Sequence, residues 1–188
     1  MAQERLAERK SEYFQGEVFA MAGASPRHVW IVANIVAEFR QQLKGKPCRV
    51  SASDLRLRVT PGGLYTYPDV MVVCGEPKFV DDGTDTIMNP KVVIEVLSPS
   101  TEQYDRGHKA QQYRTIDSLQ ELALVSQYGP GVEVFRRHEL GTWLLTDFTG
   151  FDAICKFESL DCEIPLAAIY KDVKFEKRPY PLPTEVRP

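Results

Sequence analysis

Two acidic residues lie in strongly apolar segments of this chain. Glu95 is enclosed by the β-branched run at 92–97, VVIEVL, and Asp69 immediately precedes the run VMVV at 70–73. An unpaired carboxylate inside a buried strand is so costly that it takes up a proton, pairs with a cation or binds a metal. If the two strands are neighbours, the carboxylates converge and offer the hard oxygen ligands that Mg²⁺ or Mn²⁺ prefers.

A lysine follows at a position that could serve the same site. Lys109, Gln112, Tyr113 and Ile116 fall at helical spacing on one face of the segment after Glu95. The apolar Ile116 indicates that this face turns inward. The lysine could then reach the carboxylates, orient an attacking water or stabilise charge that develops at phosphorus. An Asp, a Glu and a Lys in this arrangement indicate phosphodiester chemistry.

Each residue also has a purely structural interpretation. Glu95 could form a buried ion pair with a core arginine such as Arg114, and Asp69 could bond the turn before its strand. Lys109 could be an ordinary solvated helix lysine. A glycoside hydrolase would also use two carboxylates, but it gives Lys109 no role.

Two short motifs give the chain a family resemblance. Pro68-Asp69 followed by Ile94-Glu95-Val96 resembles the PD-(D/E)xK nuclease superfamily. The segments IEVLSPST at 94–101 and YDRGHKAQQY at 104–113 resemble its Uma-two (Uma2) family of restriction-type endonucleases, over about residues 12–137. The resemblance implies a restriction-endonuclease-like core, a DNA substrate and Mg²⁺ or Mn²⁺ held by the two acids.

The sequence departs from the superfamily pattern at one position. Leu97 stands where the motif places a lysine, two residues after Glu95. The resemblance implies that Lys109 takes over that role from the following helix. It also makes Glu17, in the segment GEVFAMAGASPRH, a third acidic candidate. Leu97 keeps a second hypothesis open, that of a catalytically silent nuclease-fold module that binds DNA or a protein partner.

Three further side chains are candidates for substrate contact. His28 and His108 suit the first turns of their helices and could bind phosphate, although capping is the simpler role. Tyr113 shares the inward face of Lys109, where it could instead be a packed aromatic. The basic residues that could follow a DNA backbone are Arg56, Arg58 and the run Arg136-Arg137-His138.

The resemblance implies an α/β (α+β) fold with a mixed central sheet flanked by helices, and the periodic segments follow the order of helices and strands in that core. We expect an N-terminal hairpin in 12–22, a helix over 26–43 and C-terminal β additions. The central strands are expected at 54–59, 65–74, 91–97, 121–127 and 132–137, with a second helix from 101 or 105 to 116. We predict one domain over 1–178, with its nuclease core in 12–137 and an extension in 138–178, followed by a proline-rich tail at 179–188.

Composition sets the remaining expectations. The 188 residues have a formal net charge of −3, which argues against coating nucleic acid through bulk charge. No apolar run approaches the length of a bilayer span, and no secretory signal is recognisable, so we expect a cytoplasmic protein without membrane contact. The four cysteines lack zinc-site spacing and are expected to be reduced. A homodimer is conceivable, with the apolar segment 151–170 as its interface.

Overall fold

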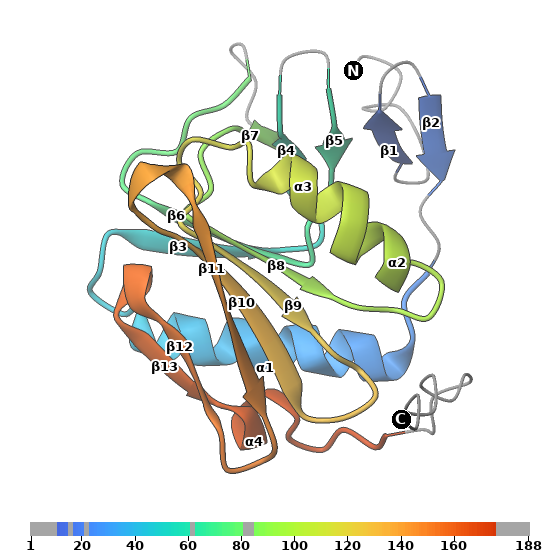
Figure 1. Cartoon of the computed structure of the whole chain (residues 1–188), viewed down its shortest axis with the longest axis vertical. Helices are drawn as coiled ribbons and strands as arrows, with labels where there is room; N and C mark the ends of the chain where they lie inside the picture. The colour runs from blue at the N-terminus through green and yellow to red at the C-terminus, as the bar shows by residue number, and fades with distance from the viewer. Residues whose placement is uncertain (1–10, 15–16, 21–22, 61–62, 81–84, 176–188) are drawn as a thin grey trace, which may run out of the picture.

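The computed structural model describes residues 11–14, 17–20, 23–60, 63–80 and 85–175 (Figure 1). Its largest element is a six-stranded sheet in the order β11-β10-β9-β8-β6-β3. Strands β8 and β9 are parallel and the other neighbours are antiparallel. The strands are β3 (Cys48–Ala52), β6 (Val70–Cys74), β8 (Val92–Val96), β9 (Glu121–Val125), β10 (Gly131–Arg137) and β11 (Trp143–Thr149). The expected mixed sheet is confirmed.

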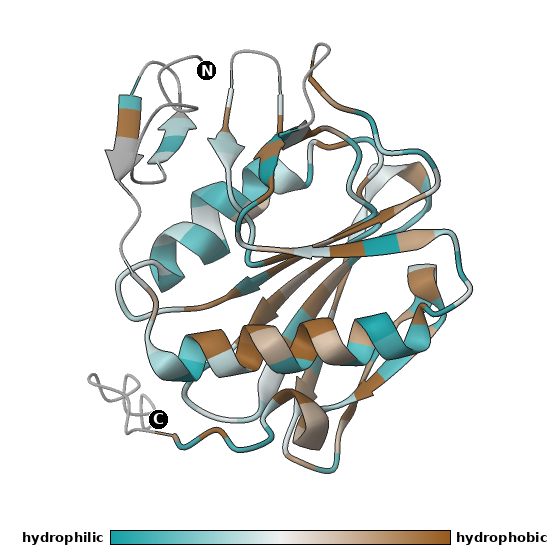
Figure 2. Cartoon of the chain, turned by 180° about the vertical axis from the view of Figure 1, so that it is seen from behind, coloured by the Kyte–Doolittle hydropathy of each residue, from teal (hydrophilic) through white to brown (hydrophobic). Residues whose placement is uncertain are grey.

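Helices cover both faces of this sheet, and the strands between them are largely hydrophobic (Figure 2). One face carries α1 (Pro26–Gln42), α4 (Leu166–Ile169) and the hairpin of β12 (Ile154–Phe157) and β13 (Cys162–Pro165). Val92 and Ile94 are buried on that side, whereas Val93 belongs to the core under the other helical layer. Because both faces of β8 are covered, its sequence shows no polar alternation.

The helical layer on the second face contains a π-helical turn. It consists of α2 (Glu102–Tyr104), a π-helical segment (Asp105–Lys109) and α3 (Ala110–Tyr113). The sequence predicted one regular helix reaching Ile116 and gave no indication of the π turn. Such turns occur mostly as insertions within α-helices and are frequent at functional sites. Here the turn begins and ends on charged residues that are both buried, Asp105 and Lys109.

A smaller sheet in the order β2-β1-β5-β4-β7 lies beside this helical layer. Its strands are β1 (Ser11–Phe14), β2 (Glu17–Ala20), β4 (Arg56–Arg58), β5 (Tyr65–Thr66) and β7 (Thr86–Ile87). The expected N-terminal hairpin is the antiparallel pair β1–β2. The half-exposed strand expected over 54–59 is wrong in one respect: Arg56 is buried and its Nε donates to the Tyr67 hydroxyl at 2.9 Å.

Cys48 and Cys74 form a disulfide, which corrects the expectation of four reduced cysteines. The two residues lie opposite each other on β3 and β6, with Cα atoms 4.0 Å apart. Their separation of 26 residues gave no signal, because the pairing depends on the strand register. Cys155 and Cys162 are free and buried. A disulfide is uncommon in cytoplasmic proteins of ordinary organisms.

The C-terminal additions follow the expected order. Strand β11 extends the main sheet, and β12 and β13 form a short hairpin that leads into α4, so the expected C-terminal β additions are confirmed. The expected proline-rich tail at 179–188 lies outside the described residues. Among the described helices, none combines the length and apolar character needed to span a bilayer.

Candidate active site

Strand pairing brings the two predicted acids together. Strands β6 and β8 are antiparallel neighbours with Val70 opposite Ile94, and continuing this register by one residue sets Asp69 opposite Glu95. Directly opposed residues direct their side chains to the same side of a sheet. The Val96 amide donates to Asp69 Oδ2 at 2.8 Å, which fixes that carboxylate at the end of the Glu95 strand. The predicted adjacency of the two strands is confirmed.

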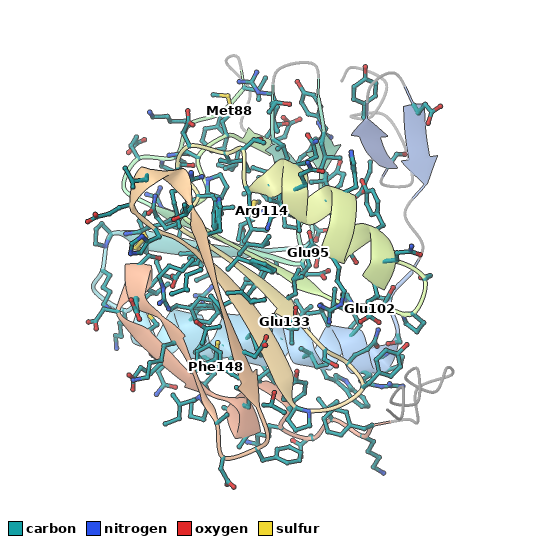
Figure 3. The ribbon with its side chains drawn as sticks, in the orientation of Figure 1. Met88, Glu95, Glu102, Arg114, Glu133 and Phe148 are labelled. Atoms are coloured by element: carbon teal, nitrogen blue, oxygen red, sulfur yellow. A yellow bond between two sulfur atoms is a disulfide. The ribbon has the colours of Figure 1, made fainter. Side chains whose placement is uncertain are left out.

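Lys109 reaches Glu95 from the helical layer. Its Nζ lies 3.1 Å from Glu95 Oε1, so the lysine does reach this carboxylate. The Tyr113 hydroxyl donates to the same oxygen at 2.5 Å. Figure 3 shows Glu95 beneath this helical layer. The alternative partner, Arg114, instead places its guanidinium 5.4 Å from the ring centroid of Phe135.

Two acids that the sequence reasoning missed complete the cluster around Lys109. Glu12 Oε1 lies 2.9 Å from the ammonium, and Asp105 Oδ1 lies 3.7 Å from it. Both acids are buried. The Thr66 hydroxyl donates to Glu12, and the Thr101 hydroxyl donates to Asp105 Oδ2 at 2.6 Å. The spacing of Asp105 and Lys109, four residues apart, was the available sequence signal for one of them.

The hairpin contributes a different acid from the one expected. Glu17, the candidate implied by the resemblance, lies on β2 and is exposed. Glu12 on β1 is the hairpin acid that reaches Lys109. Glu12 belongs to a four-residue strand whose inward face could not be assigned from periodicity, because so short a strand contains too few apolar positions.

The cluster holds more acids than cations. Burial raises the pKa of Glu95 to about 8 against the lowering effect of Lys109, and the charges of Asp69 and Asp105 raise it further. Burial likewise raises the pKa of Asp105. Burial alone would lower the pKa of Lys109, but Glu95 and its other negative neighbours hold it well above the ordinary value. Among the residues that the structure describes, a single ammonium therefore faces the carboxyl groups of Glu95, Glu12 and Asp105, with Asp69 beside them.

The two histidines differ in their relation to this cluster. His28 Nε2 lies 2.9 Å from Asp69 Oδ1, so the first turn of α1 supports the second carboxylate. The other ring nitrogen, Nδ1, is buried and has no hydrogen-bond partner among the described residues. His108 instead stacks on Tyr104, with ring centroids 5.9 Å apart. The structure thus connects His28 to the acids and gives His108 an aromatic neighbour.

The basic residues proposed to follow DNA take part in structural contacts. Arg56 is buried, and Arg58 bonds the Met88 sulfur at 2.5 Å. Arg136 pairs with the buried Glu121 at 3.0 Å. Arg137 donates to main-chain carbonyls after α3, including Ile116 O at 2.7 Å. These contacts give each of the four arginines a structural role that does not require DNA.

Two of these acids, Asp69 and Glu95, could hold a divalent cation that needs few protein ligands. Within the described ranges, no three His, Cys, Asp or Glu residues are grouped so that together they could hold a metal ion. Mg²⁺ is usually bound through one or two carboxylates, with water and substrate phosphates completing its octahedron. Asp69 and Glu95, opposed across two paired strands, match that requirement. The excess of buried acid near them would also be relieved by a cation.

One family model matches most of the chain, and two proteins of known sequence are similar to it over most of their length. The family model Uma2, described as "Putative restriction endonuclease", matches residues 2–167. Two proteins of Synechocystis sp. (strain ATCC 27184 / PCC 6803 / Kazusa), "Uncharacterized protein sll1609" and "Uncharacterized protein slr1290", are 36% and 35% identical over 157 and 172 residues. The matches cover 84% and 92% of this chain and 89% of each relative.

A solved structure has the same fold. The crystal structure of "a putative nuclease belonging to DUF820" from Anabaena variabilis matches with a TM-score of 0.71 at 20% identity. The match covers 87% of this chain and 91% of that one. At this identity the likeness shows the fold, and the chemistry must be argued from the site itself.

Proposed function

Because this chain belongs to the Uma2 family, we propose that it is an endonuclease that hydrolyses DNA phosphodiester bonds with the help of Mg²⁺ or Mn²⁺. The family description and the nuclease-like fold support a nuclease role. The observation that carries the finer proposal is the pairing of Asp69 with Glu95 beside Lys109. Two carboxylates can hold a cation that activates water, and a nearby ammonium can stabilise the charge that develops at phosphorus.

Asp69 and Glu95 would hold the cation in this proposal. When bound, a divalent cation at such a site lowers the pKa of an attacking water and neutralises charge on phosphate oxygens. His28 and the Val96 amide fix the orientation of Asp69 through both of its oxygens. Tyr113 fixes Glu95 through Oε1, so the ligand oxygens are positioned before substrate arrives.

Lys109 is the proposed replacement for the lysine missing at Leu97. Its raised pKa keeps the side chain protonated over the whole physiological range. A buried ammonium beside the scissile phosphate would stabilise the negative charge that develops there. Glu12 and Asp105 hold the ammonium between them, which preserves its position while substrate enters.

The silent-module hypothesis also has a supporting observation. Glu95 Oε1 already accepts from Tyr113 and contacts Lys109, so the cluster is a closed network without a metal. A module of this kind would bind DNA or a protein partner and would need no cation. Calorimetric titration with Mn²⁺ separates the two hypotheses, because the nuclease site requires uptake of a cation.

The proposal is tested by incubating the protein with supercoiled plasmid DNA and Mn²⁺ or Mg²⁺. The wild-type protein should give nicked or linear DNA, and Asp69→Asn should abolish the reaction. Glu133→Gln is a matched control, since Glu133 lies on β10 and forms its ion pair with Arg106 instead of Lys109. Equal cleavage by wild type and Asp69→Asn would refute the site.

A further inference from the structure

Strand β11 forms one edge of the six-stranded sheet. Proteins usually protect a long edge strand from pairing with another chain by lysine, proline or a bulge. The sequence of β11, WLLTDFT, contains no lysine or proline, and Asp147 is its single charge. Leu144 and Leu145 are 54% and 46% exposed. Apart from Asp147, the strand therefore lacks the usual edge protection, and it carries apolar side chains on both faces.

The hydrogen bonds at the two ends of β11 show which main-chain groups face outward. The His138 amide donates to Thr142 O at 2.8 Å, and the Gly150 amide donates to Pro130 O at 2.9 Å. In an antiparallel pair, alternate residues bond the same neighbour, so the even-numbered residues of β11 bond β10. The residues whose main-chain groups face away from β10 are Trp143, Leu145, Asp147 and Thr149. Within the described ranges, none of these outward groups has a hydrogen-bond partner.

We propose that a second copy of this chain pairs with β11 in antiparallel orientation, about a twofold axis at Leu145. The outward N–H and C=O of Leu145 would then bond the same groups of the partner's Leu145. The two six-stranded sheets would become one continuous sheet. Such an interface is isologous, so the surface must be complementary to itself.

The order of residues on β11 meets this requirement. Pairing about Leu145 sets Trp143 opposite the partner's Asp147, because both lie two residues from the axis. The Arg137 guanidinium lies 4.6 Å from the centroid of the Trp143 ring and donates to the carbonyls of Arg114, Ile116 and Leu119. Each Asp147 would therefore lie opposite the Trp143 ring of the other copy, and no acid would lie opposite another acid across the axis.

The apolar residues beyond the ends of β11 are also arranged for self-pairing. Leu140 is 100% exposed before the strand, and Phe151 is 52% exposed after it. In the proposed register Leu140 falls opposite the partner's Gly150, next to the partner's Phe151. The symmetry repeats this contact at the other end, so Leu140 of each copy becomes a neighbour of the partner's Phe151. A peptide of unrelated sequence would have no reason to match both ends.

The interface would not use the candidate active site, so the dimer and the proposed catalysis can fail independently. Sedimentation equilibrium should find a dimer of the wild-type chain at micromolar concentration. Leu145→Lys places a charge at the axis and should raise the dimer dissociation constant at least 100-fold. The matched control is Val18→Lys, since Val18 is 65% exposed on β2, the edge strand of the other sheet, and should leave the dimer unchanged.

Cross-linking tests the register. With a short bismaleimide, Leu145→Cys should join two copies efficiently, because the paired Cα atoms would lie about 5.5 Å apart. Asp147→Cys should join them poorly, because the two thiols would be four residues out of register, roughly 13 Å along the strand. The free native cysteines are both buried. A wild-type monomer, a dimeric Leu145→Lys variant, or more efficient cross-linking at 147 than at 145 would each overturn the proposal.

Discussion

Replacement of Glu95 by glutamine should change how the stability of the metal-free protein depends on pH. Burial raises the pKa of Glu95 from its ordinary 4.5 to about 8, so the folded state keeps a proton that the unfolded state releases. Between those two values the folded state binds more protons, and its stability therefore falls as the pH rises. Glu95→Gln resembles the protonated side chain at every pH and should lack this fall.

The magnitude follows from the two pKa values. A difference of 3.5 pH units between about 8 and 4.5 corresponds to at most about 5 kcal/mol, at about 1.4 kcal/mol per unit. The two proteins should be similarly stable at pH 5, where Glu95 is protonated. At pH 9 the variant should be the more stable, by up to that amount. Glu12, which lies 2.9 Å from Lys109 in the wild-type chain, remains as a partner for the ammonium in the variant.

The assay is urea unfolding of both proteins at pH 5, 7 and 9 in the presence of a chelator. The wild type should lose stability from pH 5 to pH 9 more steeply than the variant. The slope of the free energy of unfolding against urea concentration should be similar in the two proteins. Parallel pH profiles would refute the argument that Glu95 is protonated in the folded protein. A variant that is several kcal/mol less stable at pH 7 would indicate a structural ion pair instead.

Three further predictions concern the lysine, the histidine and the disulfide. Lys109→Met should lower plasmid cleavage at least 100-fold. It should also destabilise the fold by roughly 3–5 kcal/mol in urea unfolding, because it leaves buried carboxylates unpaired. Unchanged cleavage would support the silent-module hypothesis. His28→Ala should weaken Mn²⁺ binding by roughly 10–100-fold in calorimetry, and His28→Gln should recover part of it by donating to Asp69; equal affinity in all three proteins would remove His28 from the site. Cys74→Ser should lower the free energy of unfolding by roughly 3 kcal/mol, since the disulfide closes a loop of 26 residues, and the difference should vanish when both proteins are reduced.

The two central acids could be identified from the sequence because they break an apolar pattern, and the lysine because it follows a helical one. Glu95 and Asp69 interrupt apolar runs, and the spacing of Lys109 and Tyr113 predicts a shared helix face. The structure places both of these helical side chains on Glu95. The succession of helices and strands followed from the order of periodic segments, whereas the mixed sheet was implied by the family resemblance.

The features that were missed depend on information that local patterns do not contain. The disulfide joins two strands whose register sets Cys48 opposite Cys74, and register is a tertiary property. Glu12 lies on a strand of four residues, too short for its buried face to be recognised. The π turn has no compositional signal in the sequence. The four-residue spacing of Asp105 and Lys109 is the one local pattern that connects this acid with the site.

The central claim is that Asp69 and Glu95 share one divalent cation. It is tested most directly by an anomalous difference map from crystals soaked in Mn²⁺. We predict one strong peak per chain, about 2.2 Å from a carboxylate oxygen of each of the two acids, and its loss in Asp69→Asn. A map without a peak between the two acids in the wild type, with Lys109 still bridging Glu12 and Glu95, would contradict the account.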